Sequence, residues 1–205
     1  MEKKQAILKT AARLFANQGF DGTTTVQIAR EAGVTEPLIF YHFKGKDELF
    51  TRIIEGMFLE YFSRLDLLEQ NPESPFKQIQ KLIELQFDIA EEFPDEVYII
   101  SSTRPVRFAD TANIFADNIK AYRRRVSSFL TGCISAGIEA GEFIPVQVEA
   151  TANLLAAMLN GIVRYQVTRS DQGDNLRQTT IDFCRRSLMN GTSGYCLING
   201  VGGGL

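Results

Sequence analysis

The chain has 205 residues, of which 44% are hydrophobic and 23% charged, so it can form one substantial core or two small ones. Its net charge of -3 and pI near 5.3 exclude a protein that binds polyanions over its whole surface. The charge is uneven, because residues 1–52 carry eight lysines and arginines against six acidic residues. A local nucleic-acid surface near the N-terminus is therefore allowed, although the composition does not demand one.

The three cysteines, Cys133, Cys184 and Cys196, are widely spaced, and no pair has the spacing of a metal or redox site. The chain is therefore predicted to lie in a reducing cytoplasm and to use no metal or other cofactor. Its N-terminus is charged and amphipathic, without the apolar centre of a signal sequence. The longest uncharged apolar run, residues 150–163, is shorter than the roughly 20 residues that cross a bilayer, which predicts a buried helix and no membrane contact.

The N-terminal region has the periodicity of short helices separated by glycines. In the first helix, the apolar residues on one face are Ile7, Ala11, Leu14 and Phe15. Gly19 is predicted to end this helix. Thr24 followed by Gln27 has the pattern of a capping box, which predicts a second helix that runs to Ala32.

A tight turn and a third helix follow. Gly33 stands where a helix end tolerates a positive φ, Thr35 can cap the next helix, and Pro37 is acceptable in a first turn. Two short helices joined by a glycine turn form a helix-turn-helix. Many helical proteins contain such corners, so this pattern alone does not specify DNA binding.

The remainder of the chain also has helical spacing, which predicts an all-α fold. A long helix over about 46–68 has a wide apolar stripe, so it can start in an N-terminal domain and end in a larger bundle. Further helices are predicted at about 76–93, 97–102, 113–140, 149–169 and 174–189. We predict a helix-turn-helix domain over 1–48, an effector-binding and dimerisation bundle over 49–190, and a flexible tail over 191–205.

Two stretches are similar to the TetR family of bacterial transcriptional regulators. "ILKTAARLFANQGFDGTTTVQIAREAGVTEPLIFYHFKGKDEL" resembles that family's DNA-binding domain, and "AGIEAGEFIP" with the following "LLAAMLNGIV" resembles its dimer-forming region. The resemblance implies a three-helix domain joined by the long helix to a bundle that dimerises through 149–169 and 174–189. It also implies a repressor that a small-molecule effector releases from a pseudo-palindromic operator in double-stranded DNA.

The resemblance places the recognition helix after Val34, with its first residues at base edges in the major groove. Helix starts and lysines suit phosphate anions, so other residues would contact the DNA backbone. The DNA-binding residues that the resemblance implies are Thr24, Thr25, Gln27, Thr35, Glu36, Pro37, Leu38, Tyr41, His42, Lys44 and Lys46.

Two positions in the recognition helix differ from the family pattern. The family commonly has a neutral or basic residue where this chain has Glu36. Glu36 could accept a hydrogen bond from a cytosine amino group and read a C·G pair, or it could only complement the helix dipole. Phe40 replaces a tyrosine that many members have, and it lacks the hydroxyl for a phosphate contact. Glu36 and the acidic charge also motivate an alternative function, a helical coregulator that binds proteins and no specific DNA.

The effector site is expected inside the bundle. Residues that could line it are Phe62, Phe87, Tyr98, Arg104, Phe115, Tyr122, Met158 and Tyr165. The alternative for each aromatic residue or methionine is a place in the hydrophobic core. Arg104 could pair with an acidic effector or lie in solvent, and "YRRRV" at 122–126 is predicted to be the solvated face of a helix.

His42 is the single histidine and could act as a catalytic base. No serine, cysteine or acidic pair at a suggestive spacing supports that role, so packing or a phosphate contact is the favoured interpretation. The sequence also lacks a phosphate-binding loop and a metal motif, and the chain is predicted not to be an enzyme.

Overall fold

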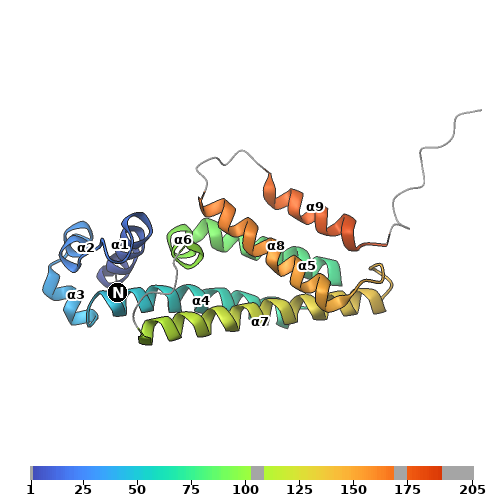
Figure 1. The fold of residues 1–205 in the computed structure, drawn as a ribbon, viewed down its shortest axis with the longest axis horizontal. Helices are drawn as coiled ribbons and strands as arrows, with labels where there is room; N and C mark the ends of the chain where they lie inside the picture. Colours follow the sequence, from blue (N-terminus) through green and yellow to red (C-terminus); the bar gives the residue numbers. More distant parts are fainter. Residues whose placement is uncertain (1, 103–108, 169–174, 191–205) are drawn as a thin grey trace, which may run out of the picture.

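The computed structural model describes residues 2–102, 109–168 and 175–190, and the fold of these residues is all-α, as predicted (Figure 1). Three short N-terminal helices, α1 (Glu2–Gln18), α2 (Thr25–Glu31) and α3 (Glu36–His42), lie at one end of the molecule. The long helix α4 (Lys46–Gln70) leads away from them. The bundle is completed by α5 (Pro75–Glu92), α6 (Pro94–Ser102), α7 (Ala109–Glu139), α8 (Val148–Thr168) and α9 (Leu176–Leu188).

The first three helices and the start of α4 share one small core, and we call residues 2–50 the head. Ile7, Ile28, Ile39 and Leu49 come from these four helices and are fully buried. The rings of Phe15, Phe20 and Phe50 pack edge-on or tilted beside them, with centroids 5.4 to 5.7 Å apart. This core fixes α3 against α2 and α4 and leaves the opposite face of α3 in solvent.

Glycine and threonine set the turns of the head. Gly19, which ends α1 as predicted, has φ 79°, and Gly33 has φ 65°, the positive value predicted for it; both are left-handed values that favour glycine. The Thr24 hydroxyl accepts a hydrogen bond from the backbone N–H of Gln27 at 3.2 Å and caps α2. Thr35 stands at the N-cap position of α3, but its side chain makes no capping hydrogen bond. The position predicted for Thr35 is therefore confirmed, and the predicted capping bond is wrong.

The helix α4 belongs to both the head and the bundle. Its 25 residues extend about 38 Å. Leu49 and Phe50 are buried in the head, whereas Met57, Tyr61 and Leu65 are buried in the bundle. The head also packs on the bundle through α1, which contacts α6. One continuous helix therefore crosses the predicted boundary at 48, and the division into domains stays a prediction.

Three arginines form ion pairs that join bundle helices. Arg64 of α4 pairs with Glu60 in its own helix and with Glu92 of α5. Arg125 of α7 pairs with Asp66 and Glu69 of α4. Arg177 of α9 pairs with Asp88 and Glu91 of α5. These pairs are largely exposed, so each contributes at most about 1 kcal/mol. Arg123 and Arg124 are exposed, as predicted for the solvated face at 122–126, whereas Tyr122 and Arg125 are half-buried and Val126 is buried.

The predicted and observed helix bounds differ mainly next to prolines. The helix predicted at 97–102 begins earlier, because Pro94 is the first residue of α6, where a missing N–H costs nothing. The helix α7 begins at Ala109, four residues before its predicted start. Arg104 and the predicted tail over 191–205 lie outside the described residues.

Gly137 in α7 faces the buried ring of Phe143. A Cβ at this position would overlap the ring, which has little room to move because Phe143 is 2% exposed. We expect Gly137→Ala to lower the free energy of unfolding by about 1–3 kcal/mol through overpacking. Gly132→Ala in the same helix would meet nothing within 4 Å and should be neutral or stabilising. Urea unfolding of both variants checks this, and an unchanged midpoint for Gly137→Ala would contradict it.

Candidate functional site

The solvent face of α3 carries two large exposed aromatic side chains. Tyr41 is 81% exposed and Phe40 is 54% exposed, whereas Ile39 and Phe43 beside them are buried in the head. Val26 of the neighbouring helix α2 is also exposed. Phe43 thus lies in the core, whereas Tyr41 lies in solvent. The buried residues hold α3 rigidly and present its outer face to a partner.

Glu36, the first residue of α3, is oriented by a contact with α2. The Thr25 hydroxyl donates a hydrogen bond to Glu36 Oε1 at 2.6 Å. The second carboxylate oxygen accepts no hydrogen bond within the described ranges, so it can accept from an external donor. The structure thus adds a positioning contact for Glu36, and both interpretations of this residue remain open.

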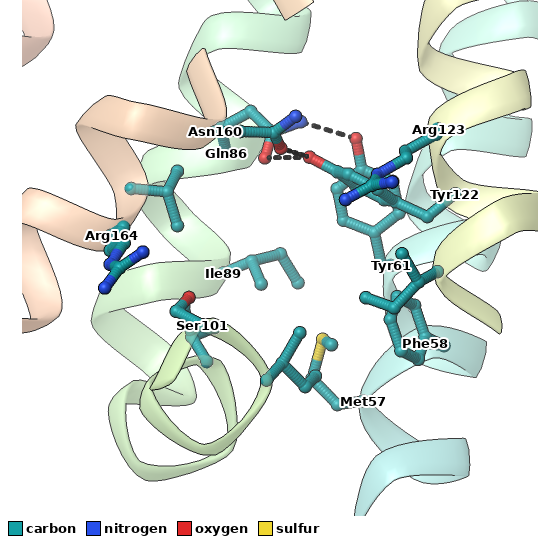
Figure 2. A pocket seen from close by; sticks show the side chains of 14 residues that line it. Met57, Phe58, Tyr61, Gln86, Ile89, Ser101, Tyr122, Arg123, Asn160 and Arg164 are labelled. Atoms are coloured by element: carbon teal, nitrogen blue, oxygen red, sulfur yellow. Dashed lines mark hydrogen bonds between the residues drawn. The ribbon is translucent and has the colours of Figure 1, made fainter. Parts of the chain in front are cut away.

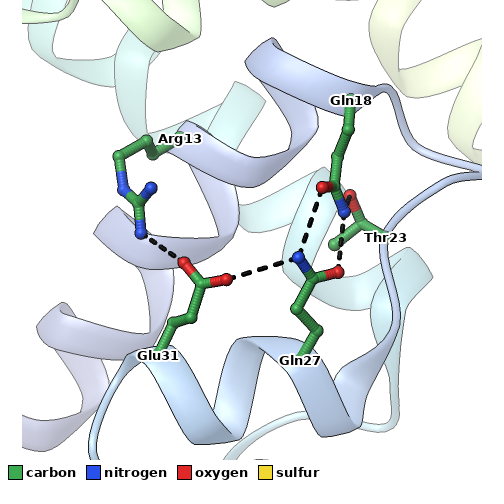
Figure 3. A network of polar contacts seen from close by, with 5 residues as sticks. All are labelled: Arg13, Gln18, Thr23, Gln27 and Glu31. Carbon is green, nitrogen blue, oxygen red and sulfur yellow. Dashed lines mark hydrogen bonds and ion pairs between the residues drawn. The ribbon is translucent and has the colours of Figure 1, made fainter.

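Gln27 belongs to a polar network that ties α1 to α2 (Figure 3). Gln18 Nε2 donates to Gln27 Oε1 at 2.7 Å, and Gln27 Nε2 donates to Glu31 Oε1 at 3.3 Å. Arg13 completes the network with an ion pair to Glu31 at 2.6 Å. The hydrogen bonds from Arg13 and Gln27 lower the pKa of Glu31, so this carboxylate stays charged. Both ends of the Gln27 amide therefore have partners within the head, which the sequence did not predict.

The two lysines after α3 have different environments. Lys46 Nζ donates to the backbone oxygen of Phe20 at 2.8 Å and lies 4.2 Å from the centroid of the Phe20 ring. Lys44 is exposed, and its backbone N–H donates to Glu48 at 2.8 Å. His42 is half-buried between Tyr41 and the core residue Phe43, with edge-on contacts to both rings. Lys46 thus joins α4 to the turn after α1, whereas Lys44 projects from the surface.

Lys46→Ala is expected to lower the free energy of unfolding by about 1–2 kcal/mol, because it removes the hydrogen bond to Phe20 and the cation–π contact. Lys44→Ala should change stability by less than about 0.5 kcal/mol. Urea unfolding followed by circular dichroism measures both effects. Equal stabilities of the two variants would show that the Lys46 contact does not hold the head together.

A cavity of about 270 Å³ lies in the bundle among α4, α5, α6, α7 and α8 (Figure 2). Its walls are mainly apolar and include Met57, Ile89, Val97, Ile119 and Val163. Because α4 continues into the head and α6 packs on α1, a ligand in this cavity would contact two helices that hold the head.

A cluster of four polar side chains lies at one end of the cavity (Figure 2). Gln86 Nε2 donates to the Tyr61 hydroxyl at 2.7 Å. The Tyr122 hydroxyl lies 3.1 Å from Gln86 Oε1 and 2.9 Å from Asn160 Oδ1. Burial raises the pKa of Tyr122 to about 12 and that of Tyr61 well above its usual value, so both hydroxyls stay protonated at neutral pH. The cluster joins one residue each from α4, α5, α7 and α8.

The structure brings few of the predicted effector residues to this cavity. Tyr122 lines it, and Arg104 lies outside the described residues. The other predicted effector residues do not line the cavity: Phe62, Phe87, Tyr98, Phe115, Met158 and Tyr165. Sequence reasoning missed Gln86, although a glutamine on the apolar stripe of α5 is a usable signal. It also missed Arg123, Asn160 and Arg164, for which the sequence offers no such signal.

No cluster of histidine, cysteine, aspartate or glutamate suited to a metal ion occurs within the described ranges. None of the helices described has the length and apolar character that a membrane span requires.

The head is similar to a known protein family. Residues 7–53 match the family model described as "Bacterial regulatory proteins, tetR family". Over 54 residues the chain is 48% identical to the HTH-type transcriptional regulator AcrR of Shigella flexneri, covering 26% of this chain and 25% of that protein. Over 108 residues it is 30% identical to the biofilm operon icaADBC HTH-type negative transcriptional regulator IcaR of Staphylococcus aureus, covering 52% of this chain and 57% of that protein. The matches thus span less than two thirds of these relatives.

Solved structures share the whole fold. The ketosteroid transcriptional regulator KstR2 of Mycobacterium tuberculosis has a TM-score of 0.75 at 21% identity, covering 93% of this chain and 96% of that one. The regulator AibR, solved in complex with isovaleryl coenzyme A and operator DNA, has a TM-score of 0.68 at 20% identity, covering 89% and 96%. At these identities the likeness establishes the fold of the head and the bundle.

Proposed function

We propose that this chain is a dimeric DNA-binding transcriptional repressor that a small effector releases. Residues 7–53, which match the model of the TetR family of bacterial regulatory proteins, support this function. The observation that carries this proposal is the outer face of α3, which a rigid core presents to solvent with Tyr41 at 81% exposure. A short helix held in this way can enter the major groove of DNA.

In this proposal, the head uses two groups of residues on DNA. Glu36, Pro37, Leu38 and Tyr41 on α3 face base edges, and the carboxylate of Glu36 is aimed by its bond from Thr25. The second group contacts phosphates and comprises Thr24, Thr25, Thr35, His42, Lys44 and Lys46. Gln27 joins either group only if its amide leaves the network that it forms with Gln18 and Glu31.

The dimer is proposed to form through α8 and α9. Both helices pack on α5, and each carries a large apolar side chain in solvent, Leu154 at 67% and Phe183 at 50% exposure. A two-fold dimer would place the two heads on half-sites about 34–36 Å apart, one turn of the DNA helix. This arrangement predicts a pseudo-palindromic operator.

The effector is proposed to bind in the bundle cavity. Residues of α4 and α6 form part of the wall of this cavity. AibR, which has the same fold, has been solved with both isovaleryl coenzyme A and operator DNA. A ligand that binds one arrangement of these helices more tightly shifts the dimer toward that arrangement. The free energy of this shift cannot exceed the difference between the ligand's binding free energies for the two arrangements.

Selection of bound sequences from a random DNA pool tests the proposed function. The chain should enrich a pseudo-palindrome, and the affinity for it should fall steeply as salt rises. If Glu36 reads a base, Glu36→Ala should relax the base preference at one position in each half-site. Lys44→Ala should instead weaken binding to all DNA sequences by the same factor. Enrichment of no sequence at any salt concentration would contradict the proposal and favour the protein-binding coregulator.

A further inference from the structure

Two arginines of the bundle line the cavity without an acidic partner. Arg64, Arg125 and Arg177 each contact two carboxylates on the bundle surface. Arg123 and Arg164 are exposed and also line the cavity, and they form no ion pair with any residue that the structure describes. They come from α7 and α8, and Figure 2 shows them on opposite sides of the space.

The charge of the cavity differs from that of the chain. No aspartate or glutamate is among the described residues that line the cavity, so its exposed edge carries two arginines without an acidic partner, in a protein with a net charge of -3. Guanidinium groups hold carboxylates through paired, charge-assisted hydrogen bonds. The lining is thus suited to a negatively charged group and unsuited to a cation.

The size and the walls of the cavity restrict the rest of the ligand. About 270 Å³ is just below the roughly 300–1,000 Å³ that is usual for sites of drug-sized ligands. Met57, Ile89 and Ile119 offer an apolar surface, where burial of hydrocarbon is favourable. A small acid with a compact hydrocarbon body fits these constraints, whereas a polyol or a sugar phosphate leaves the apolar wall unmatched.

We propose that the cavity binds a small apolar carboxylate, with its carboxylate attracted by the exposed guanidinium groups of Arg123 and Arg164 and its hydrocarbon body between Ile89 and Ile119. The inference rests on the proposed function only in taking this acid as the effector that acts on the operator. Binding of the acid itself is a property of the bundle and is measured without DNA.

Calorimetric titration of the full chain with matched acids and amides tests this assignment. The probes are hexanoate with hexanamide and 3-phenylpropanoate with 3-phenylpropanamide, because each pair shares a body and differs in charge. At least one acid should bind about tenfold or more tightly than its amide. Arg123→Gln combined with Arg164→Gln should remove this preference. The control Arg124→Gln changes the neighbouring exposed arginine and should preserve it.

Three results would overturn the assignment: equal binding of acid and amide, a preference that survives in the double variant, or no binding of either acid up to about 10 mM. Operator binding is assayed separately, with and without the acid. An acid that binds but releases no operator leaves the cavity assignment intact and contradicts only its effector role. Failure to select any operator contradicts the proposed function and leaves the titration result unaffected.

Discussion

Replacing Phe183 by glutamate is expected to separate the proposed dimer into monomers and to weaken operator binding by at least about 100-fold. Phe183 is 50% exposed on α9, where its ring would be covered by the second subunit. A carboxylate at that position would lose its hydration without gaining a partner, which costs several kcal/mol in each copy. Two-fold symmetry places the change in the interface twice. Light scattering measures the mass, and fluorescence anisotropy with labelled operator measures the affinity.

Gln70→Glu is the matched control for this variant. It adds the same negative charge at an exposed position at the end of α4, a helix that is not part of the proposed interface. We expect it to remain dimeric and to bind the operator with nearly unchanged affinity. A Phe183→Glu protein that is still a dimer at micromolar concentration would place the interface elsewhere. A monomer that binds the operator as tightly as the dimer would contradict the two-half-site mode.

The helices of the head follow from local signals in the sequence. Gly19 and Gly33 end helices because their backbones take positive φ values, and Thr24 starts α2 because its hydroxyl satisfies a free N–H group. Helical periodicity likewise places Ile39 in the core and Tyr41 in solvent. These features depend on residues within a few positions of each other, so the sequence predicts them well.

The contacts of individual side chains depend on long-range packing. Lys46 bonds to Phe20 only because α4 returns past the end of α1, and Gln27 meets Gln18 only because α2 crosses α1. Residues from five helices line the cavity. The apolar periodicity of one helix shows which side faces inward, but it does not show which of those residues border the cavity. Phe87 illustrates this limit, because it is buried as predicted but lies in the core and not at the cavity.

The polar cluster at the end of the cavity should have a large effect on stability. Gln86 is 3% exposed and forms hydrogen bonds with the hydroxyls of Tyr61 and Tyr122. Gln86→Leu would remove the amide that donates to the buried Tyr61 hydroxyl, whereas the Tyr122 hydroxyl would keep Asn160, so we expect the free energy of unfolding to fall by about 1–3 kcal/mol. Urea unfolding at pH 7 and fixed protein concentration measures this change, because a dimer's stability depends on concentration.

A double-mutant cycle separates the polar contact from simple packing. Tyr61→Phe alone should also destabilise the protein, because the Gln86 amide loses its acceptor. The double variant removes both partners and should cost less than the sum of the single changes, with a coupling of about 0.5–3 kcal/mol. Tyr98→Phe removes a hydroxyl that does not line the cavity and should change stability by less than about 0.5 kcal/mol. Additive effects of Tyr61→Phe and Gln86→Leu would mean that the 2.7 Å contact contributes no stability, and that α4 and α5 are held together by their apolar residues and the Arg64–Glu92 ion pair.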